Sequence, residues 1–486
     1  MKTIAIFLLA GLLIATAGVA PAATAAKPNI VLILIDDMGY GDIAPFGATQ
    51  CKTPALDRMS REGMRLTSFY AAPVCSASRA QIQTGSYAPR VSIPAVLNPN
   101  SGVGLNPAEH TVAKLLKTQG YATMCVGKWH LGDQPEFLPT RYGFDHYFGL
   151  PYSNDMLRPK ADTGEKVVPL MRDDQVIELM NDADQDKLNR IYTEAAVRFI
   201  REQRGNPFYL YLAHTAVHVP IHPGSEFRGR SGNGLYYDWV GETDWSVGQV
   251  LDTLRELRLE TNTLVVFTSD NGPWLSKGAD AGTAGPLRGG KGSTWEGGMR
   301  VPTLAWWPGQ IPAGRASDAV AGEIDLLPTL VSLAGGTVPA DKPIDGANIS
   351  DLLRGRSEVS AREAHYFYHA YDLQAVRSGP WKLALRPQGF SMGFKEDEQR
   401  KGESKPGLRL YNLDTDIGET TDVAAAHLDV VKRLKALADK QAAALANNSP
   451  RGPGIRPPGR VENPQFLYPV KETANKKPKK PATGKK

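Results

Sequence analysis

The segment from Asn29 to Asp36 reads Asn-Ile-Val-Leu-Ile-Leu-Ile-Asp, and its unbroken run of aliphatic residues constrains the fold more than any other feature. A strand with one face in water alternates apolar and polar residues, whereas a strand covered on both faces is apolar throughout. The segment therefore predicts a strand buried inside a parallel sheet.

Helices and strands are expected to alternate along roughly the next 300 residues, which is typical of an α/β fold. A helix is predicted from Thr53, a good N-cap residue, because Pro54 suits the first helical position. The predicted helices cover 53–64, 108–118, 187–203, 239–257 and 324–334, and the predicted strands cover 121–126, 208–212 and 263–268. We expect a mainly parallel sheet sandwiched between helices.

From about Ala364 the pattern changes to short apolar segments joined by turns. Predicted strands at 366–369, 374–377, 381–385 and 408–413, followed by a helix at 428–445, indicate a smaller antiparallel sheet closed by a helix. The expected organisation is a catalytic domain at 26–363, a C-terminal subdomain at 364–448 and a disordered tail at 449–486, which is rich in proline and lysine.

The N-terminus has the pattern of a signal peptide covering residues 1–25. Lys2 is followed by an apolar run from Ile4 to Ala20, and Ala23-Thr24-Ala25 offers a small-x-small cleavage site. An uncleaved membrane anchor is the rival interpretation, although the run is short for a spanning helix. We expect an exported protein, periplasmic or secreted, with no integral membrane segment after cleavage.

The formal charge of +5 comes largely from the end of the chain, where KETANKKPKKPATGKK contains seven lysines and one glutamate. Without this tail the protein is close to neutral. A basic patch or stripe is the usual sign of a folded body that binds nucleic acid. The charge distribution therefore does not indicate such a body, and we expect no nucleic-acid partner, although the tail could touch an anionic polymer or a membrane surface.

Two predicted strands end in pairs of oxygen ligands. Asp36 and Asp37 follow the first strand, and Asp270 and Asn271 follow the strand at 263–268. In open α/β sheets, ligands bind beyond the carboxyl ends of the strands, so both pairs should lie at the same edge. Three carboxylates and an amide suit Ca²⁺ or Mg²⁺ better than zinc, although each pair taken alone could be a solvated loop.

The chain has three cysteines, Cys51, Cys75 and Cys125, so at most one disulfide can form and one thiol is left over. Arg79 lies four residues after Cys75, which is one helical turn if a helix begins there. The N-terminus of such a helix would favour an anion at Cys75. A buried free cysteine near a surface arginine is the alternative, and the spacing alone leaves both open.

Cationic side chains follow the ends of further strands. Lys128 and His130 come after the strand at 121–126, His218 comes after the strand at 208–212, and Lys291 lies in a glycine-rich segment. Glycines allow backbone to approach a ligand closely. Cations and a divalent metal around one pocket indicate a tetrahedral oxyanion substrate, either sulfate or phosphate.

Taken together and in order, these motifs resemble those of the type I, formylglycine-dependent sulfatases of the alkaline phosphatase superfamily. The similarity runs from about Asn29 to Leu445, and the segment from Val265 to Gly335 is particularly similar to arylsulfatases and N-acetylgalactosamine-6-sulfatases. Ala77 stands where many members have proline, which bears on which enzyme matures Cys75. The motifs that carry the resemblance are Asp36-Asp37, Cys75 to Arg79, Gly127 to Gly132, His218-Val-Pro, Asp270-Asn-Gly and Gly290 to Gly298.

The resemblance implies that a maturation enzyme converts Cys75 to formylglycine. The hydrate of this aldehyde supplies two hydroxyls, one to attack sulfur and one to expel sulfate afterwards. It also implies one Ca²⁺ held by Asp36, Asp37, Asp270, Asn271 and the modified Cys75. Arg79 and Lys128 would orient the hydrate, and His130 would be the base for sulfate release. His218 and Lys291 would hold the sulfate oxygens and help to protonate the leaving group. Cys51 and Cys125 are interpreted as structural thiols, and His214 and His222 receive no role.

The leading hypothesis is a hydrolase of sulfate esters on carbohydrates, such as 6-sulfated N-acetylgalactosamine or galactose, or on aryl groups. A phosphate mono- or diester hydrolase of the same superfamily is the second hypothesis, but such relatives often use threonine or serine where this chain has Cys75. A non-catalytic binder of sulfated glycans is the third. Such a binder should lack some of the metal ligands or cations, and this chain has all of them.

Overall fold

The computed structural model describes residues 27–388, 392, 407–445, 448–449 and 452–471. Within them, the central sheet has eleven strands, in the order β13-β2-β12-β11-β1-β10-β5-β6-β8-β7 with β9 beside β8. Its strands are β1 (Asn29–Ile35), β2 (Met64–Leu66), β5 (Ala122–Gly127), β6 (His146–Gly149), β7 (Arg158–Pro159), β8 (Lys166–Arg172), β9 (Gln175–Met180), β10 (Phe208–Ala213), β11 (Thr263–Ser269), β12 (Thr303–Trp306) and β13 (Arg315–Ser317).

The middle of the sheet is parallel, as predicted. β1 lies between β10 and β11 and pairs with both in parallel register, and every residue of β1 is buried. Towards the edges the sheet becomes mixed, because β12 runs antiparallel to β11 and β8 runs antiparallel to β6. The α/β architecture expected from the apolar run is confirmed.

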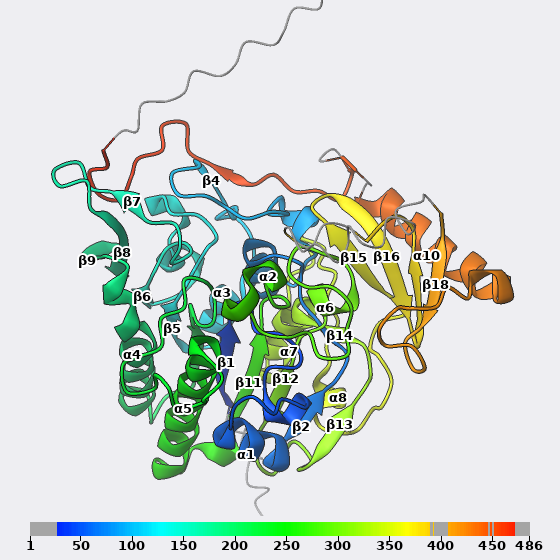
Figure 1. The fold of residues 1–486 in the computed structure, drawn as a ribbon, viewed down its shortest axis with the longest axis horizontal. Coiled ribbons are helices and arrows are strands. Elements are labelled where there is room, and N and C mark those ends of the chain that lie inside the picture. Colours follow the sequence, from blue (N-terminus) through cyan, green and yellow to red (C-terminus); the bar gives the residue numbers. More distant parts are fainter. Residues whose placement is uncertain (1–26, 389–391, 393–406, 446–447, 450–451, 472–486) are drawn as a thin grey trace, which may run out of the picture.

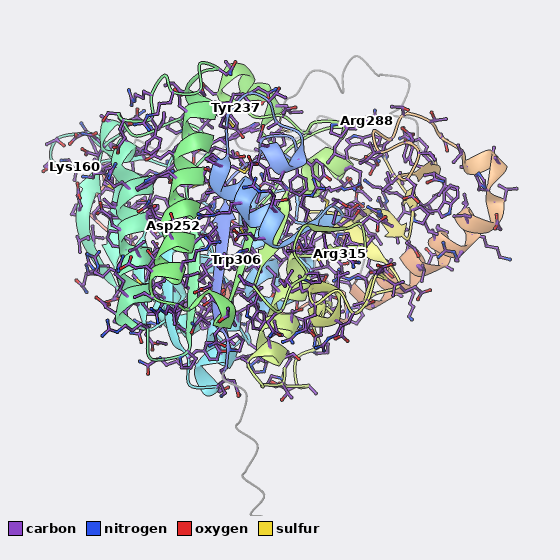
Figure 2. The ribbon with its side chains drawn as sticks, turned by 90° about the horizontal axis from the view of Figure 1, so that it is seen from below. Lys160, Tyr237, Asp252, Arg288, Trp306 and Arg315 are labelled. Atoms are coloured by element: carbon purple, nitrogen blue, oxygen red, sulfur yellow. The ribbon has the colours of Figure 1, made fainter. Side chains whose placement is uncertain are left out.

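Successive residues of β1 pack into two different cores, one on each face of the sheet. Ile30, Leu32 and Leu34 belong to the core under α2, α3 and α7, whereas Val31 and Ile33 belong to the core under α1, α4 and α5. Figure 1 shows the two helical layers, and in Figure 2 Tyr237 and Asp252 mark the course of α5 along its face. The helices are α1 (Pro54–Glu62), α2 (Cys75–Thr84), α3 (Val112–Thr118), α4 (Leu188–Glu202), α5 (Leu235–Glu256), α6 (Glu296–Met299), α7 (Leu326–Leu333) and α8 (Ser350–Leu353).

One predicted helix begins later than expected. The expectation was a start at residue 108, but α3 begins at Val112 because Thr111 is extended and its hydroxyl accepts a hydrogen bond from the Lys114 amide. A threonine at the N-cap accepts a hydrogen bond from a first-turn amide that has no carbonyl partner within the helix. The apolar period continues upstream of the cap, which is why the sequence pattern alone extended the helix.

The C-terminal part is an antiparallel sheet with a helix packed on it, also as predicted. The sheet order is β15-β16-β17-β18, and α10 packs on β16 and β17. These elements are β15 (His365–His369), β16 (Asp372–Ser378), β17 (Trp381–Ala384), β18 (Arg409–Asn412) and α10 (Leu428–Leu445). Two small two-stranded sheets complete the fold: β3 (Phe69–Tyr70) with β14 (Ala321–Gly322), and β4 (Val103–Gly104) with β19 (Gly459–Arg460).

The prediction of an unpacked tail from residue 449 is wrong for residues 452–471, which we call the strap. The strap runs back across the catalytic part of the chain, as the red trace in Figure 1 shows. Its strand β19 pairs with β4, Arg456 forms an ion pair with Glu109 at 2.8 Å, and the Tyr468 hydroxyl donates to the Val167 carbonyl. Composition favoured disorder, but these backbone and side-chain partners hold the segment in place.

The predicted signal peptide and the lysine-rich end lie outside the described residues. Among the helices that are described, none combines the length and the apolar character needed to cross a bilayer. The domain boundaries given above stay predictions.

Candidate active site

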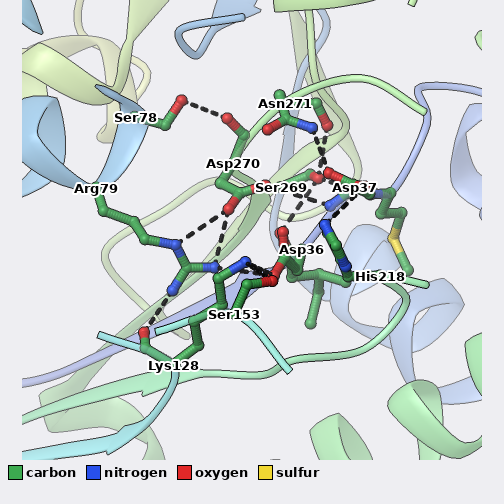
Figure 3. Close-up of polar contacts among 12 residues, drawn as sticks. Asp36, Asp37, Ser78, Arg79, Lys128, Ser153, His218, Ser269, Asp270 and Asn271 are labelled. Atoms are coloured by element: carbon green, nitrogen blue, oxygen red, sulfur yellow. Dashed lines mark hydrogen bonds and ion pairs between the residues drawn. The ribbon is translucent and has the colours of Figure 1, made fainter. Parts of the chain in front are cut away.

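The two pairs of oxygen ligands meet at one edge of the sheet. Ile35 of β1 is paired in register with Ser269 of β11, so Asp36 and Asp270 leave adjacent strands at the same level. Oxygen atoms of Asp36, Asp37 and Asp270 lie within 4.8 Å of one another, and all three residues are buried. Figure 3 shows the cluster together with the side chains that surround it.

Hydrogen bonds fix the cluster but leave two oxygens without partners. Asn271 Nδ2 donates to Asp37 Oδ1 at 2.7 Å, and the Asp37 amide donates to Asp270 Oδ1 at 3.2 Å. Asp36 Oδ1 and Asn271 Oδ1 are buried and accept no hydrogen bond from the described residues. Unpartnered buried oxygens are costly. Carboxylate and amide oxygens are the ligands that hard divalent cations take, so this donor set fits Ca²⁺ or Mg²⁺.

Cys75 is the first residue of α2 and lies beside the oxygen cluster. Its Sγ, an oxygen of Asp36 and a ring nitrogen of His218 lie within 4.8 Å of one another. Only 2% of Cys75 is exposed, and burial raises the pKa of its thiol to about 11 despite the nearby Lys128 and Lys291. An unmodified thiol here is therefore protonated at neutral pH and is a weak nucleophile.

Arg79 lies one turn further along α2 and connects the helix to the oxygen cluster. Its Nε and Nη2 donate to Asp270 Oδ2 at 3.1 and 2.8 Å, and Nη2 lies 3.6 Å from Asp36 Oδ2. The same guanidinium donates to the carbonyl of Lys128. Both partners of the Arg79–Asp270 pair are fully buried.

Lys128 follows β5 and contacts the carboxylate of Asp36. Its Nζ also donates to Ser153 Oγ at 3.0 Å. Burial alone would raise the pKa of Asp36, but Lys128 and the neighbouring cations outweigh burial and hold it well below its usual range. Asp36 is thus ionised and able to accept a metal.

Lys291 and His218 face the other carboxylate, Asp37. Lys291 Nζ lies 2.6 and 2.8 Å from the two oxygens of Asp37, and His218 Nε2 lies 3.7 Å from Oδ2. Burial opposes the charge on Lys291, yet Asp37 outweighs it and raises the lysine pKa. Burial and then Lys291 lower the pKa of His218, whose Nδ1 donates to the Val219 carbonyl. Nε2 is therefore the nitrogen that faces the site.

His130 has a left-handed backbone conformation, with φ of 60°, which is uncommon for residues other than glycine. Its Nε2 lies 2.9 Å from the Leu97 carbonyl, which fixes a proton on that nitrogen, while Nδ1 is buried without a partner. Burial, followed by Lys128 and Arg79, lowers the pKa of His130 well below its usual value. The ring is neutral at neutral pH, so Nδ1 has a lone pair that can accept a proton.

A second buried charge cluster joins the C-terminal sheet to the glycine-rich segment that carries Lys291. Lys382 of β17 donates to the Thr294 carbonyl at 2.9 Å and lies 3.0 Å from Glu296 and 2.9 Å from Glu419. All three charged side chains are fully buried. Arg300, Arg377 and the Tyr70 hydroxyl complete the surroundings of Glu296.

The structure brings all the predicted site residues into one region, namely Asp36, Asp37, Cys75, Arg79, Lys128, His130, His218, Asp270, Asn271 and Lys291. The cysteines at 51 and 125 are free thiols. His214 bonds to Ser246 Oγ, and His222 lies between Asp182 and Asp186, so neither contacts this cluster in the contacts described.

Sequence reasoning missed two serines that support the site. Ser78 Oγ accepts from the Ala72 amide and donates to the Asp270 carbonyl, and Ser153 contacts Lys128 as described above. Ser78 is one residue from Arg79, so a closer look at the helix that begins at Cys75 could have found it. Ser153 lies in a loop after β6 and carries no such signal.

The chain matches known protein families along most of its length. Residues 28–336 match the family described as Sulfatase, and residues 290–441 match the family described as N-sulphoglucosamine sulphohydrolase, C-terminal. N-acetylgalactosamine-6-sulfatase of Canis lupus familiaris is 36% identical over 478 residues, which cover 90% of each chain. Arylsulfatase A of Homo sapiens is 38% identical over 453 residues, covering 85% of this chain and 88% of the relative.

A solved structure shares the whole architecture. The PsFucS1 sulfatase from Pseudoalteromonas sp. superposes with a TM-score of 0.78 at 27% sequence identity, covering 86% of this chain and 90% of the other. The similarity thus extends beyond the central sheet.

Proposed function

Since this chain belongs to the sulfatase family and is a sulfuric ester hydrolase, we propose that it removes sulfate from sulfated carbohydrate using a formylglycine made from Cys75 and one bound Ca²⁺. The observation that carries the proposal is the position of Cys75. Its Sγ lies at the N-terminus of a helix, within 4.8 Å of Asp36 and His218, and the helix is tied to Asp270 by Arg79.

The metal would be held by Asp36, Asp37, Asp270, Asn271 and the modified side chain at 75. Two of the required ligand atoms, Asp36 Oδ1 and Asn271 Oδ1, are the buried oxygens that lack partners. Bound Ca²⁺ supplies positive charge that favours ionisation of a hydroxyl beside it. Magnesium is the other cation that this donor set would accept.

Formylglycine supplies, as its hydrate, two hydroxyls on one carbon, one for attack on sulfur and one for later release of sulfate. Arg79 and Lys128 flank this position and would orient the hydrate. His130 Nδ1, which is neutral and unpartnered, would take the proton from the second hydroxyl.

Lys291 and His218 lie on the Asp37 side of the pocket. We assign them to binding the sulfate oxygens and protonating the ester oxygen as the alcohol departs. A buried set of cations around a compact anion favours a closed pocket for one sulfate group over a long groove. The protein would act outside the cytoplasm, in the periplasm or as a secreted enzyme, after its signal peptide is removed.

The test compares matched esters. We expect kcat/KM for 4-nitrophenyl sulfate to exceed that for 4-nitrophenyl phosphate, with N-acetylgalactosamine 6-sulfate as a better substrate than either. A phosphate monoester carries nearly one more negative charge than a sulfate ester near neutral pH. The two esters therefore need different amounts of positive charge around the bound group. A much higher value for the phosphate, with no desulfation of any sulfated sugar, would assign the chain to phosphate hydrolysis.

A further inference from the structure

Trp274 packs against two side chains of the proposed active site, His218 and Lys291. It follows the metal-ligand pair Asp270-Asn271 by three residues and is half-buried, whereas the residues around Asp270 are fully buried. Its ring centroid lies 5.6 Å from the His218 ring and 4.7 Å from Lys291 Nζ. Its indole N–H donates to the Met392 carbonyl at 3.3 Å, which holds the ring in this orientation.

The two residues that Trp274 contacts are those on the leaving-group side of the proposed reaction. The sulfur atom of a bound sulfate ester must face residue 75 for attack to occur. The alcohol part of the ester then points away from α2 and Asp270. If His218 and Lys291 protonate the departing oxygen, the first ring of the alcohol lies within reach of the indole. The C–H face of a sugar ring packs well against an aromatic ring and loses little water in doing so.

Lys277 contacts the same indole ring and is exposed. Its Nζ is 4.2 Å from the Trp274 ring centroid, and it has no carboxylate partner among the residues that the structure describes. The buried cations of the pocket, by contrast, are each paired with Asp36, Asp37 or Asp270. An exposed cation without a partner is free to meet a negative charge on a ligand.

We propose that Trp274 and Lys277 form a subsite for the alcohol part of the substrate, which takes a sugar ring against Trp274 and a second anionic group, a carboxylate or another sulfate, against Lys277. The subsite rests on the proposed function, because it is defined relative to the sulfate pocket. It makes the preferred substrate a multiply charged sulfated saccharide.

The experiment separates ring binding from sulfate binding. We expect Trp274→Ala to lower kcat/KM for N-acetylgalactosamine 6-sulfate about tenfold, chiefly through KM, and Trp274→Phe to restore most of it. The inhibition constant of inorganic sulfate, which has no ring, should change less than twofold in both variants. Loss of sulfate inhibition in Trp274→Ala would mean that the indole acts only by holding Lys291, and unchanged kcat/KM would remove Trp274 from substrate binding. Either result overturns the subsite.

Lys277→Gln should lower kcat/KM for a sulfated disaccharide that has a neighbouring uronate by about threefold to tenfold at low salt. The same variant should leave kcat/KM for a monosaccharide sulfate with an otherwise neutral ring unchanged. Equal effects on both substrates would contradict the role of Lys277. Calorimetric titration of the same saccharides into Cys75→Ala, with and without Trp274→Ala, measures the subsite without turnover. If the wild-type chain desulfates nothing but these saccharides still bind through Trp274, the proposed reaction fails and the subsite stands.

Discussion

Arg79 donates two hydrogen bonds to a single oxygen, Oδ2, of Asp270, and both side chains are fully buried. The pair joins the helix that begins with Cys75 to the end of β11, 191 residues further along the chain. A charge-assisted pair in a buried setting is strong and fixes geometry closely. The positions of the proposed nucleophile and of the proposed metal ligands are therefore set by the same contact.

Cys75 should occur as formylglycine in active protein. Mass spectrometry of the peptide that contains residue 75 should show the aldehyde form, which reacts with hydrazides and resists alkylation by iodoacetamide. Cys75→Ala should abolish turnover with an unchanged melting temperature, because the side chain has no structural partner beyond the pocket. A fully active preparation in which residue 75 is entirely an alkylatable thiol would refute the assignment.

Asp270→Ala should lose metal and activity together. The substitution removes one ligand and leaves Arg79 without its main partner, so we expect a fall in kcat of at least about a hundredfold. Elemental analysis and titration with Ca²⁺ measure the metal. Asp270→Asn keeps an oxygen ligand and is the matched control, with weaker metal binding than wild type but stronger than the alanine variant. Full activity after exhaustive chelation would rule out a metal requirement.

Lys382→Met should destabilise the protein by about 3 kcal/mol or more, because it leaves Glu296 and Glu419 buried beside each other without the cation that they share. The thermal midpoint measures the loss. Glu419→Gln in the Lys382→Met background should recover part of it, since one buried charge is then removed. If the single variant is as stable as wild type, the cluster does not tie the two parts of the chain together energetically.

Stability should depend on pH through Glu242 of α5. Burial raises the pKa of this carboxyl to about 7, more than the hydrogen bond from the Gly224 amide lowers it. The folded state then binds a proton that the unfolded state releases above about pH 4.5, so the Glu242 contribution to stability falls as pH rises from about 4.5 to 7.

Glu242→Gln tests this sign. The variant should match wild type at pH 4.5 and exceed it above pH 7 by roughly 2–3 kcal/mol, because glutamine is never ionised and can still accept from Gly224. The difference in melting temperature between the two proteins, followed from pH 4.5 to 8, is the measurement. A difference that stays constant with pH would show that the pKa of Glu242 is the same in the folded and the unfolded protein.

The clustering of the proposed metal ligands and the cations could be predicted from sequence because they follow the ends of apolar strands, and parallel strands end at one edge. The same logic could not find Ser153 or the role of Trp274, since both act through neighbours that are distant in the sequence. The hairpin of β8 and β9 was missed because neither strand alternates apolar and polar residues and Pro169 interrupts the first. The strap was missed because its order comes from β4, Glu109 and Val167.

The burial of Cys75 has a consequence for when it can be altered. A second protein cannot reach a side chain that is 2% exposed at the base of a charged pocket. The Leu97 carbonyl contacts His130, and the chain then continues into β4, which pairs with residues 459–460 of the strap. An enzyme that modifies Cys75 would therefore need this part of the chain to be open, with α2 not yet packed and β4 not yet paired. If Cys75 is converted to formylglycine as proposed, the conversion would precede completion of the fold.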